Sequence, residues 1–367
     1  MIDLIFSPSF GNKPRTLVGR NKVMADLIGG LHSFPGSKER ARLIIGQRGM
    51  GKTVLLLEIA EYARNNGYIV ASPTVVSDDM LERILEKLNR DSAKLFSNKK
   101  TIITGGSVGF LGFSAGIQTE HQELVKHSFA DRLQTMCEEA QKINKGILIL
   151  VDEVQSSSEE LKKLIIAYQE MVGMNVNIAI VLAGLPISIS QTLNQHVLTF
   201  LNRASKVNLE PISIAEIELF FRKSFNKLGL KLNDKLISEA AARTEGSPYL
   251  MQLVGHYITV SAADDGVITD IDFDKAITLA RREFIKDICE TTIAPLSAKD
   301  IEFLKAMAID DSESAMKDIA LRLSVDSSYA NRYRTRLMQS DVIKSTRRGY
   351  VEFAVPYLRD YFAAEDK

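Results

Sequence analysis

The sequence predicts a parallel α/β domain, then an all-helical domain, then a winged helix-turn-helix. Three observations lead to this order. In the first half of the 367-residue chain, short apolar segments alternate with amphipathic ones. Strand-like segments stop at Pro211, and the chain closes with three helical segments and an alternating pair of short segments. We expect the domains to span residues 1–210, 211–293 and 294–367.

The α/β domain is predicted from four runs that are apolar throughout and rich in β-branched residues, as buried parallel strands are. These runs are 42–45, 67–72, 146–151 and 178–183. The amphipathic segments predict helices over 54–65, 79–88, 121–143 and 157–171. The glycine-rich stretch 101–117 breaks the alternation, and we expect a β-hairpin there. The alternative is a loop that touches a neighbouring subunit or a ligand.

Helix-start signals define the all-helical domain. Ser213 and Glu216 have the spacing of a capping box, and Asn233 begins a second helix that ends at Gly246. Pro248 stands where the first turn of a third helix tolerates proline. Asp270 is expected to cap a long fourth helix that reaches toward Cys289. Pro295 marks the next boundary.

The last segment has the element order of a winged helix. Helices are expected over 297–308, 314–323 and 327–339, and strands over 342–345 and 350–353. In the third helix Tyr329, Tyr333 and Leu337 recur every four residues, which predicts a buried stripe. The wing tip would carry Arg347 and Arg348.

The composition limits the kinds of partner that the protein can bind. The chain has 46 basic and 46 acidic residues, so a charged partner must be met by a local patch rather than by a global field. Cys137 and Cys289 suggest neither a disulfide framework nor a metal site, so we expect a reducing, cytoplasmic setting. The N-terminal residues do not have the pattern of a secretory signal, and no apolar run is long enough to span a bilayer. We therefore expect no membrane partner.

The stretch from Gly46 to Thr53, GQRGMGKT, matches the P-loop pattern GxxxxGK[ST]. An apolar strand precedes it and a helix follows, whereas a coincidental glycine turn would need neither. The glycines let backbone N–H groups surround a phosphate at the start of a helix. Lys52 would neutralise the β- and γ-oxygens, and the Thr53 hydroxyl would bind Mg²⁺. The predicted nucleotide-binding residues of this stretch are Gly46, Gln47, Arg48, Gly49, Met50, Gly51, Lys52, Thr53 and Val54.

Two carboxylates, Asp152 and Glu153, follow the third apolar run. The carboxyl ends of parallel strands are where such sheets bind ligands. We expect Asp152 to hold Mg²⁺ through water and Glu153 to polarise the attacking water as a general base. The alternative is a solvated strand end. Together with a P-loop, the pair predicts hydrolysis of a nucleoside triphosphate rather than binding alone.

At this point the chain resembles prokaryotic AAA+ ATPases of the origin-recognition, initiator-like clade, which is related to the signal-transducing STAND ATPases. The resemblance covers nearly the whole chain. Its residues are the P-loop, the Asp152–Glu153 pair, and three further motifs: Val18-Gly19-Arg20, Ala183-Gly-Leu-Pro186 and Gly246-Ser-Pro-Tyr-Leu-Met-Gln252. It implies a P-loop AAA+ core, a helical lid and a winged helix.

The resemblance also implies roles for single residues. Val18, Gly19 and Arg20 would border the adenine of ATP, and Pro248 would line the nucleotide from the lid. Arg203 lies where the family often has an arginine finger, which reaches a neighbouring subunit's γ-phosphate. A homo-oligomer in the ATP state follows from that role, and a surface arginine is the alternative.

The sequence departs from the family pattern at two places that affect the expected rate of ATP hydrolysis. Residues 183–186 offer no polar sensor for the γ-phosphate, and residues 246–252 contain no arginine for a second sensor. We therefore expect slow hydrolysis, which suits a timed switch better than a motor.

The third helix of the winged segment predicts contact with duplex DNA. Small polar side chains suit base edges and arginines suit phosphates. The candidate residues are Ser328, Asn331, Arg332, Arg334, Thr335, Arg347 and Arg348. Two alternatives stay open: a STAND-like switch whose winged helix is structural and whose partner is a protein, and a nucleotide-binding scaffold with negligible turnover.

Overall fold

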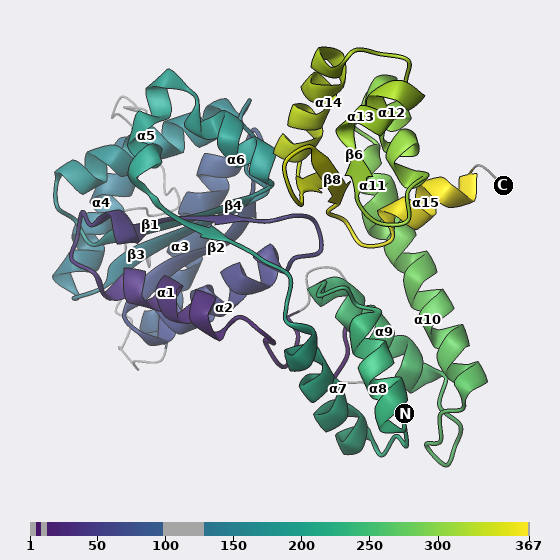
Figure 1. The fold of residues 1–367 in the computed structure, drawn as a ribbon. Helices are drawn as coiled ribbons and strands as arrows, with labels where there is room; N and C mark the ends of the chain where they lie inside the picture. Colours follow the sequence, from purple (N-terminus) through teal and green to yellow (C-terminus); the bar gives the residue numbers. More distant parts are fainter. Residues whose placement is uncertain (1–4, 9–12, 98–127, 366–367) are drawn as a thin grey trace. The chain divides into compact units, whose positions relative to one another are not determined.

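The computed structural model of the chain describes residues 5–8, 13–97 and 128–365. Its contacts divide the chain into two compact units (Figure 1). We call Lys22–Ile45 with Lys52–Asn208 the sheet unit. We call Met1–Asn21, Gly46–Gly51 and Leu209–Lys367 the helical unit. The domain boundaries at 210/211 and 293/294 stay predictions.

The sheet unit contains a five-stranded parallel sheet in the order β2-β3-β4-β1-β5. Its strands are β1 (Ala41–Ile45), β2 (Tyr68–Val75), β3 (Gly146–Asp152), β4 (Ile178–Gly184) and β5 (Ser205–Asn208). The four predicted strands are confirmed at nearly the expected bounds. The strand β5 was not expected because its sequence, SKVN, contains one buried valine and no apolar run.

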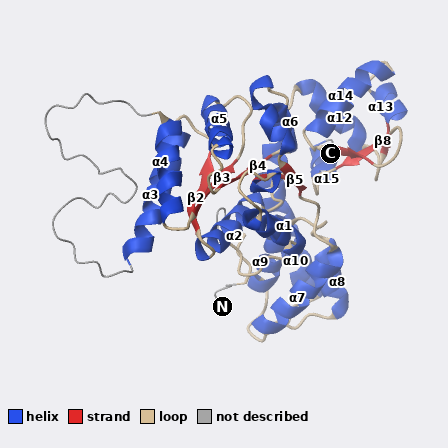
Figure 2. Ribbon diagram, turned by 90° about the vertical axis from the view of Figure 1, so that its left-hand side faces the viewer, coloured by secondary structure: helices blue, strands red, loops and turns tan. Residues whose placement is uncertain are grey.

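Helices cover both faces of this sheet. They are α1 (Asn21–His32), α2 (Lys52–Asn65), α3 (Met80–Ser97), α4 (Phe129–Lys142), α5 (Glu159–Gly173) and α6 (Pro186–Leu193), with 3₁₀ turns η1 (Lys38–Arg40) and η2 (His196–Arg203). Helices α3, α4 and α5 share one apolar core with the sheet, whereas α2 packs on the opposite face (Figure 2). The hairpin predicted at 101–117 and the start of the helix predicted at 121 lie outside the described residues.

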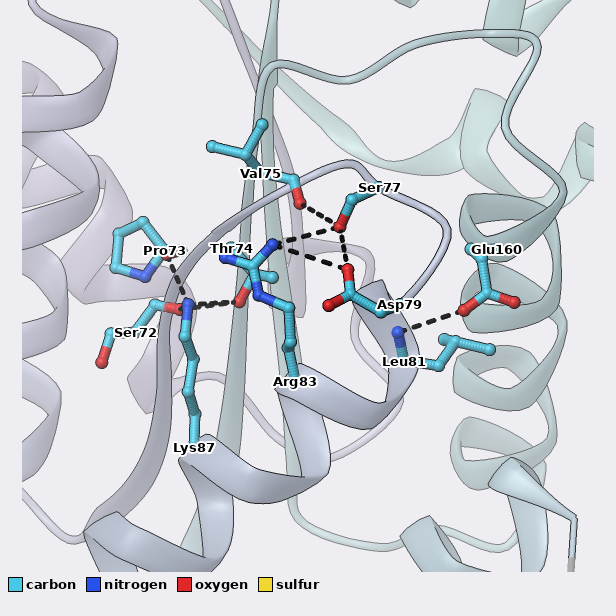
Figure 3. A network of polar contacts seen from close by, with 10 residues as sticks. All are labelled: Ser72, Pro73, Thr74, Val75, Ser77, Asp79, Leu81, Arg83, Lys87 and Glu160. Atoms are coloured by element: carbon cyan, nitrogen blue, oxygen red, sulfur yellow. Dashed lines mark hydrogen bonds and ion pairs between the residues drawn. The ribbon is translucent and has the colours of Figure 1, made fainter.

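The edge strand β2 is held at an irregularity by a lysine from α3 (Figure 3). Its register against β3 shifts between Ala71 and Thr74, where Pro73 lacks the N–H that a regular ladder needs. Lys87 Nζ lies 3.2 Å from the Ser72 carbonyl, 2.8 Å from the Pro73 carbonyl and 2.8 Å from Thr74 Oγ1. Partial burial, and then two nearby arginines, lower the pKa of Lys87 to about 8.

The turn after β2 is ordered in the same way. Arg83 Nη1 lies 3.1 Å from Ser77 Oγ and 3.7 Å from Asp79 Oδ1. Val75, just before this turn, pairs with Asp152 across the sheet. The polar network in Figure 3 therefore stabilises the strand beside the predicted catalytic carboxylates.

The helical unit begins with α7 (Ile214–Leu228), α8 (Asp234–Ala242), α9 (Pro248–Val260) and α10 (Asp270–Phe284). A π-helical turn, η3 (Ile285–Cys289), and a short helix, α11 (Glu290–Ile293), continue from α10. Asn233 caps α8 as predicted, and Pro248 is the first residue of α9.

Ser213 stands at the N-cap of α7 but forms no capping box, and the predicted cap residue of α10 is wrong. Ser213 makes no side-chain cap bond, and Glu216 instead interacts electrostatically with Arg20. The cap of α10 is Thr269 rather than Asp270. Its hydroxyl accepts the N–H of Asp272 and the Asp272 carboxylate accepts the Thr269 N–H, so the capping box begins one residue earlier than expected.

The C-terminal segment follows the predicted order of elements. It consists of α12 (Ala298–Ala308), β6 (Ser314–Ala315), α13 (Met316–Arg322), α14 (Ser327–Gln339), β7 (Ile343–Ser345), β8 (Tyr350–Phe353) and α15 (Leu358–Glu365). The three strands form an antiparallel sheet in the order β6-β8-β7. The strand β6 and the helix α15 were not predicted.

The buried stripe of α14 differs from the prediction. Ala330 and Leu337 are fully buried, Tyr333 packs at the edge of the core, and Tyr329 lies outside it. A spacing of four rotates by about 40° per step around a 3.6-residue helix, so two steps carry Tyr329 away from the face of Leu337. Spacings of three and four, at 330, 333 and 337, keep the stripe on one face.

The N-terminal residues are anchored in the core of the helical unit. Phe6 is 2% exposed, and its ring centroid lies 5.7 Å from Phe220, 5.9 Å from Phe221 and 5.7 Å from Phe225. A Cβ at Gly255 would come within 2.2 Å of the Phe6 ring, so α9 can approach Phe6 this closely only with glycine there.

Among the described helices, none has the length and apolar character needed to cross a membrane.

We predict that Phe6→Ala lowers the free energy of unfolding by about 3 kcal/mol, because a buried ring is replaced by a cavity. Urea unfolding followed by circular dichroism measures the change. Phe34→Ala is the control, since Phe34 is 74% exposed and should change stability by less than about 0.5 kcal/mol. Equal stabilities of Phe6→Ala and the parent would show that residues 5–8 do not belong to the core.

Candidate active site

The carboxyl end of β3 brings two predicted site residues into direct contact. Asp152, the last residue of the strand, is 4% exposed. Its Oδ2 accepts a hydrogen bond from Thr53 Oγ1 at 2.5 Å, and its Oδ1 accepts the Glu153 N–H at 2.9 Å. Thr53 lies in the first turn of α2, directly after the half-buried Lys52. The fold thus joins residues that lie 99 positions apart in the sequence.

Glu153 occupies a special position at the end of this strand. Its φ is +53°, a left-handed conformation that residues other than glycine adopt uncommonly. The side chain is exposed, whereas Asp152 and Val154 on either side are buried. The backbone therefore turns at the point where a carboxylate would have to reach solvent to act on a water molecule.

The oxygen donors at this strand end suit Mg²⁺. This hard cation keeps several of its waters and is bound by one or two protein oxygens together with substrate phosphates. Thr53 and Asp152 supply one hydroxyl and one carboxylate. In the described part of the chain, no group of three or more His, Cys, Asp or Glu side chains is arranged to hold a metal ion. An ion here would therefore depend on phosphate oxygens for its remaining ligands.

The loop before α2 has the backbone that its glycines predict. Gly49 and Gly51 have φ values of +74° and +82°, where an L side chain is strained. A Cβ at Gly46 would lie 3.0 Å from the Leu209 Cβ, which is tighter than ordinary contact. Met50 is 7% exposed and fixes one side of the loop. Residues 46–51 belong to the helical unit, and the motif passes into the sheet unit at the next peptide bond.

Arg20 holds this loop from the N-terminal side. Its guanidinium donates to the Glu210 carbonyl at 2.8 Å and to the Met50 carbonyl at 3.4 Å. The residue is 5% exposed, and burial lowers the pKa of its guanidinium, an effect that nearby Glu216 opposes. Arg20 therefore contacts the loop backbone, and the adenine contact that the resemblance implies stays a prediction.

Gly19 and Val18, the neighbours of Arg20 in this motif, pack within the helical unit. Gly19 has a φ of +67°, and a Cβ there would collide with Ile212 Cγ2 at 2.6 Å. Val18 packs at the edge of the core of the helical unit. Val54, the last residue of the predicted nucleotide-binding stretch, is half-buried in the first turn of α2.

The start of α9 carries another predicted nucleotide-binding residue, Pro248. Pro248 is half-buried at its first position, and the next residue, Tyr249, donates its hydroxyl to Asp287 Oδ2 at 2.6 Å. Burial, and then this hydrogen bond, raise the pKa of the Tyr249 hydroxyl. Gln252 is buried, and its Oε1 accepts the Ser7 N–H at 2.9 Å. Both polar side chains of this helix start are therefore bound to protein groups.

Arg203 lies far from the carboxylates of its own sheet. It is exposed at the end of η2, two residues before β5 begins. Ser205, the first residue of β5, pairs with Arg42 near the amino end of β1. Asp152 ends β3 at the opposite, carboxyl edge of the sheet. Arg203 and Asp152 therefore lie toward opposite edges of the sheet.

The candidate DNA-contacting residues of α14 lie on its exposed side. Ser328, Asn331, Arg332 and Thr335 are exposed, and Arg334 is half-buried with its Nη2 3.4 Å from Ser345 Oγ. Between β7 and β8, Arg347 pairs with Glu313 and lies over the Tyr350 ring at 3.7 Å from its centroid, whereas Arg348 is exposed.

One contact of the loop could not be found from the sequence. Gln47 Nε2 donates to the Asp341 carbonyl at 2.8 Å, while the neighbouring Arg48 is exposed. The two residues are 294 positions apart, and Asp341 belongs to a turn with no motif of its own. Asp287, the partner of Tyr249, was missed because an acidic residue inside a helix carries no distinguishing pattern.

Comparisons with known proteins find two family models that match parts of the chain. Residues 16–181 match the AAA ATPase domain family. Residues 286–362 match a domain family of unknown function, DUF8462. No curated protein matches the chain in sequence.

Solved structures share the fold over the whole chain. The Walker-type ATPase PABY2304 of Pyrococcus abyssi aligns with a TM-score of 0.69 at 15% identity, covering 96% of this chain and 97% of that one. The ORC2 protein of Aeropyrum pernix, in ADPNP–ADP complexes, aligns with a TM-score of 0.66 at 15% identity, covering 97% and 95%. Cdc6p of Pyrobaculum aerophilum aligns with a TM-score of 0.51 at 14% identity, covering 98% and 97%.

We predict that Arg20→Ala weakens the binding of ATP about tenfold, because two hydrogen bonds from a charged group to the loop are lost. Since the guanidinium holds the backbone, binding of GTP should weaken by the same factor. Titration calorimetry with both nucleotides measures the effect, and Arg15→Ala is the control on the same segment. An unchanged affinity for ATP, or a loss for ATP alone, would contradict the positioning role.

Proposed function

We propose that the chain is an AAA+ ATPase whose nucleotide state controls engagement of duplex DNA. The match of residues 16–181 to the AAA ATPase domain family supports the ATPase activity, and the fold shared with the ORC2 and Cdc6p structures supports the AAA+ architecture. The C-terminal segment would act as a winged helix, with α14 as the recognition helix and the β7–β8 turn as the wing. The observation that carries the proposal is the exposed polar and basic side of α14.

In the proposed reaction, each residue of the site has a separate task. The N–H groups of residues 46–51 and the Lys52 ammonium bind the phosphates. Mg²⁺, when bound, screens the phosphate charge and polarises the phosphoryl oxygens. Thr53 and Asp152 hold that ion, and their short contact supports this pairing. Glu153 accepts a proton from the attacking water, and its exposed position supports that role.

Hydrolysis is proposed to be slow, because the usual charged sensors are missing. At the end of β4, Gly184 packs between Val154 and Ile189, so this strand end offers an apolar surface to the γ-phosphate. The Tyr249 hydroxyl at the start of α9 is bound to Asp287. A transition state that receives fewer positive charges is reached more slowly, and the ATP-bound form then lasts long enough to act as a switch.

The charge arrangement of the C-terminal segment supports a DNA contact. Ser328, Asn331 and Thr335 present short polar groups of the kind that meet base edges, and Arg332 beside them suits a phosphate. Not every basic residue contributes equally. Arg336 pairs with the buried Asp300, and Arg347 pairs with Glu313. We therefore assign the wing contact mainly to Arg348.

A protein partner is the second candidate for the same surface. The Tyr329 and Tyr333 rings lie 4.8 Å apart, and the Tyr333 hydroxyl donates to that of Tyr329. The guanidiniums of Arg332 and Arg336 lie over these rings at 5.8 Å and 4.8 Å. Partly exposed tyrosines covered by arginines are typical of protein interfaces, and they favour the STAND-like alternative.

We further propose a homo-oligomer in the ATP state, in which Arg203 acts as an arginine finger. Its exposure at the edge of the sheet opposite Asp152 supports action on a neighbouring subunit. The cysteines Cys137 and Cys289 are both free thiols, in keeping with the proposed cytoplasmic location.

We predict that Arg332→Ala combined with Arg348→Ala weakens duplex binding at least tenfold at moderate salt. Each arginine that neutralises a phosphate adds about 0.9 to the slope of log affinity against log salt, so the slope should fall by about two. Fluorescence anisotropy with a labelled duplex, at several salt concentrations and with Glu153→Gln to preserve ATP, measures both quantities.

The control removes two positive charges elsewhere. Arg90 and Lys163 are 76% and 65% exposed on α3 and α5, and Arg90→Ala with Lys163→Ala should leave the slope unchanged. If the parent protein binds duplex no better than the doubly substituted protein does, α14 is not a DNA-recognition helix. The tyrosine–arginine surface would then favour the protein partner.

We predict that Arg203→Ala keeps the affinity for ATP and lowers turnover by roughly a hundredfold or more, because a finger acts only on the transition state. Mixing it with Lys52→Ala tests action between subunits. An interface between the two variants can combine an intact Lys52 with an intact Arg203, so the mixture should regain part of the activity. A mixture that stays inactive over a range of ratios would leave Arg203 a surface residue.

A further inference from the structure

The P-loop is hydrogen-bonded to the turn that follows α14, through Gln47 and the Asp341 carbonyl at 2.8 Å. We propose that this bond transmits the nucleotide state of the loop to the C-terminal segment. The inference rests on the function proposed above and names the physical route of its regulation. Gln47 is the second residue of the P-loop, and Asp341 joins α14 to β7.

The turn is built in a way that makes this carbonyl a suitable acceptor. The Asp341 N–H donates to the Met338 carbonyl at 3.0 Å, and the Val342 N–H donates to the Leu337 carbonyl at 3.0 Å. Asp341 has a φ of +56°, so the pattern is a Schellman motif with an aspartate in the left-handed position. The motif uses the N–H groups of two residues and leaves the Asp341 carbonyl oxygen outside its own hydrogen bonds. That oxygen accepts the hydrogen bond from the Gln47 side-chain amide.

A displacement of this turn must reach α14 and β7. Leu337 on one side of the turn is fully buried, and Val342 and Ile343 on the other are 1% exposed. All three belong to the same apolar core. Close-packed side chains shift together rather than independently, so the turn cannot move without re-orienting the helix that carries the candidate DNA face.

The loop is equally constrained at its other end. The Gly49 carbonyl accepts the Tyr249 N–H at 3.3 Å, and a Cβ at Gly49 would lie 3.5 Å from Ile288 in the π-helical turn. The Met50 carbonyl accepts from Arg20. A phosphate bound by the N–H groups of this loop sets the backbone conformation around Gln47. While the Gln47–Asp341 bond lasts, that conformation is conveyed to the turn.

The bond uses a side-chain donor on one side and a main-chain acceptor on the other, and this asymmetry makes it testable. Gln47→Ala removes the donor. Gln47→Glu keeps the size but brings a carboxylate, which cannot donate, to a carbonyl oxygen. Asp341→Asn keeps the carbonyl and a residue that tolerates left-handed backbone, so it is the matched control.

The experiment measures the affinity of Glu153→Gln protein for a labelled duplex without ATP and with saturating ATP. The ratio of the two dissociation constants is the coupling between the sites, and DNA must change the affinity for ATP by the same factor. Losing one neutral hydrogen bond should move this ratio toward one by roughly three- to tenfold in Gln47→Ala and Gln47→Glu. The ratio in Asp341→Asn should equal that of the parent, and equal ratios in all four proteins would overturn the inference.

Hydrogen exchange separates this inference from the proposed function. In Glu153→Gln protein, addition of ATP should change the exchange of a peptide that spans residues 337–345, and Gln47→Ala should abolish the change. If the parent binds no duplex, or binds it equally with and without ATP, the proposed function fails, and the exchange result alone decides whether the bond transmits the nucleotide state. If ATP changes the exchange of residues 337–345 equally in the parent and in Gln47→Ala, the inference that this bond transmits the nucleotide state is wrong.

Discussion

Hydrogen bonds to one glycine loop link distant segments of the helical unit. Residues 46–51 need left-handed glycines to curl around a phosphate, and such a backbone has few contacts of its own. Three groups from distant parts of the chain hold it: Arg20, the N–H of Tyr249 and the turn at Asp341. A phosphate bound to this loop, as we propose, would therefore act on the N-terminal segment, on α9 and on the C-terminal segment at once.

The sheet unit carries the candidate catalytic carboxylates at the end of a buried strand. Every residue of β3 is buried, so the position of Asp152 is fixed by packing on both faces of the sheet. The hydroxyl of Thr53 meets that carboxylate directly, and Glu153 leaves the strand in a left-handed turn toward solvent. From α3, Lys87 and Arg83 bond to the edge strand and to the turn after it, beside the carboxylates.

Some arginines of the C-terminal segment form ion pairs within the protein, whereas others are exposed to solvent. Arg336 and Arg347 are paired with Asp300 and Glu313, and such pairs hold α14 and the turn between β7 and β8 in place. Arg332 and Arg348 lie on the exposed side. A chain whose total charge is zero can therefore still present a basic face, because its acidic residues are used to orient particular arginines rather than to neutralise all of them.

The sequence by itself determined the parallel α/β core, the order of the main helices and the residues of the candidate site. Apolar runs, cap residues and the P-loop are local patterns, and each encodes the conformation of its own few residues. The strand β5, the capping residue of α10 and the true stripe of α14 needed the structure, because alternative local readings differ by only one position or by one short polar segment.

Only the tertiary structure decided which groups meet across long stretches of the chain. Arg20 bonds to the loop backbone, the Tyr249 hydroxyl is taken by Asp287, and Gln47 reaches Asp341. In each case at least one partner is a main-chain carbonyl or an ordinary polar residue within a helix, which has no signature in sequence. Such contacts are set by how whole elements pack, and packing depends on the combined shape of many side chains rather than on any local pattern.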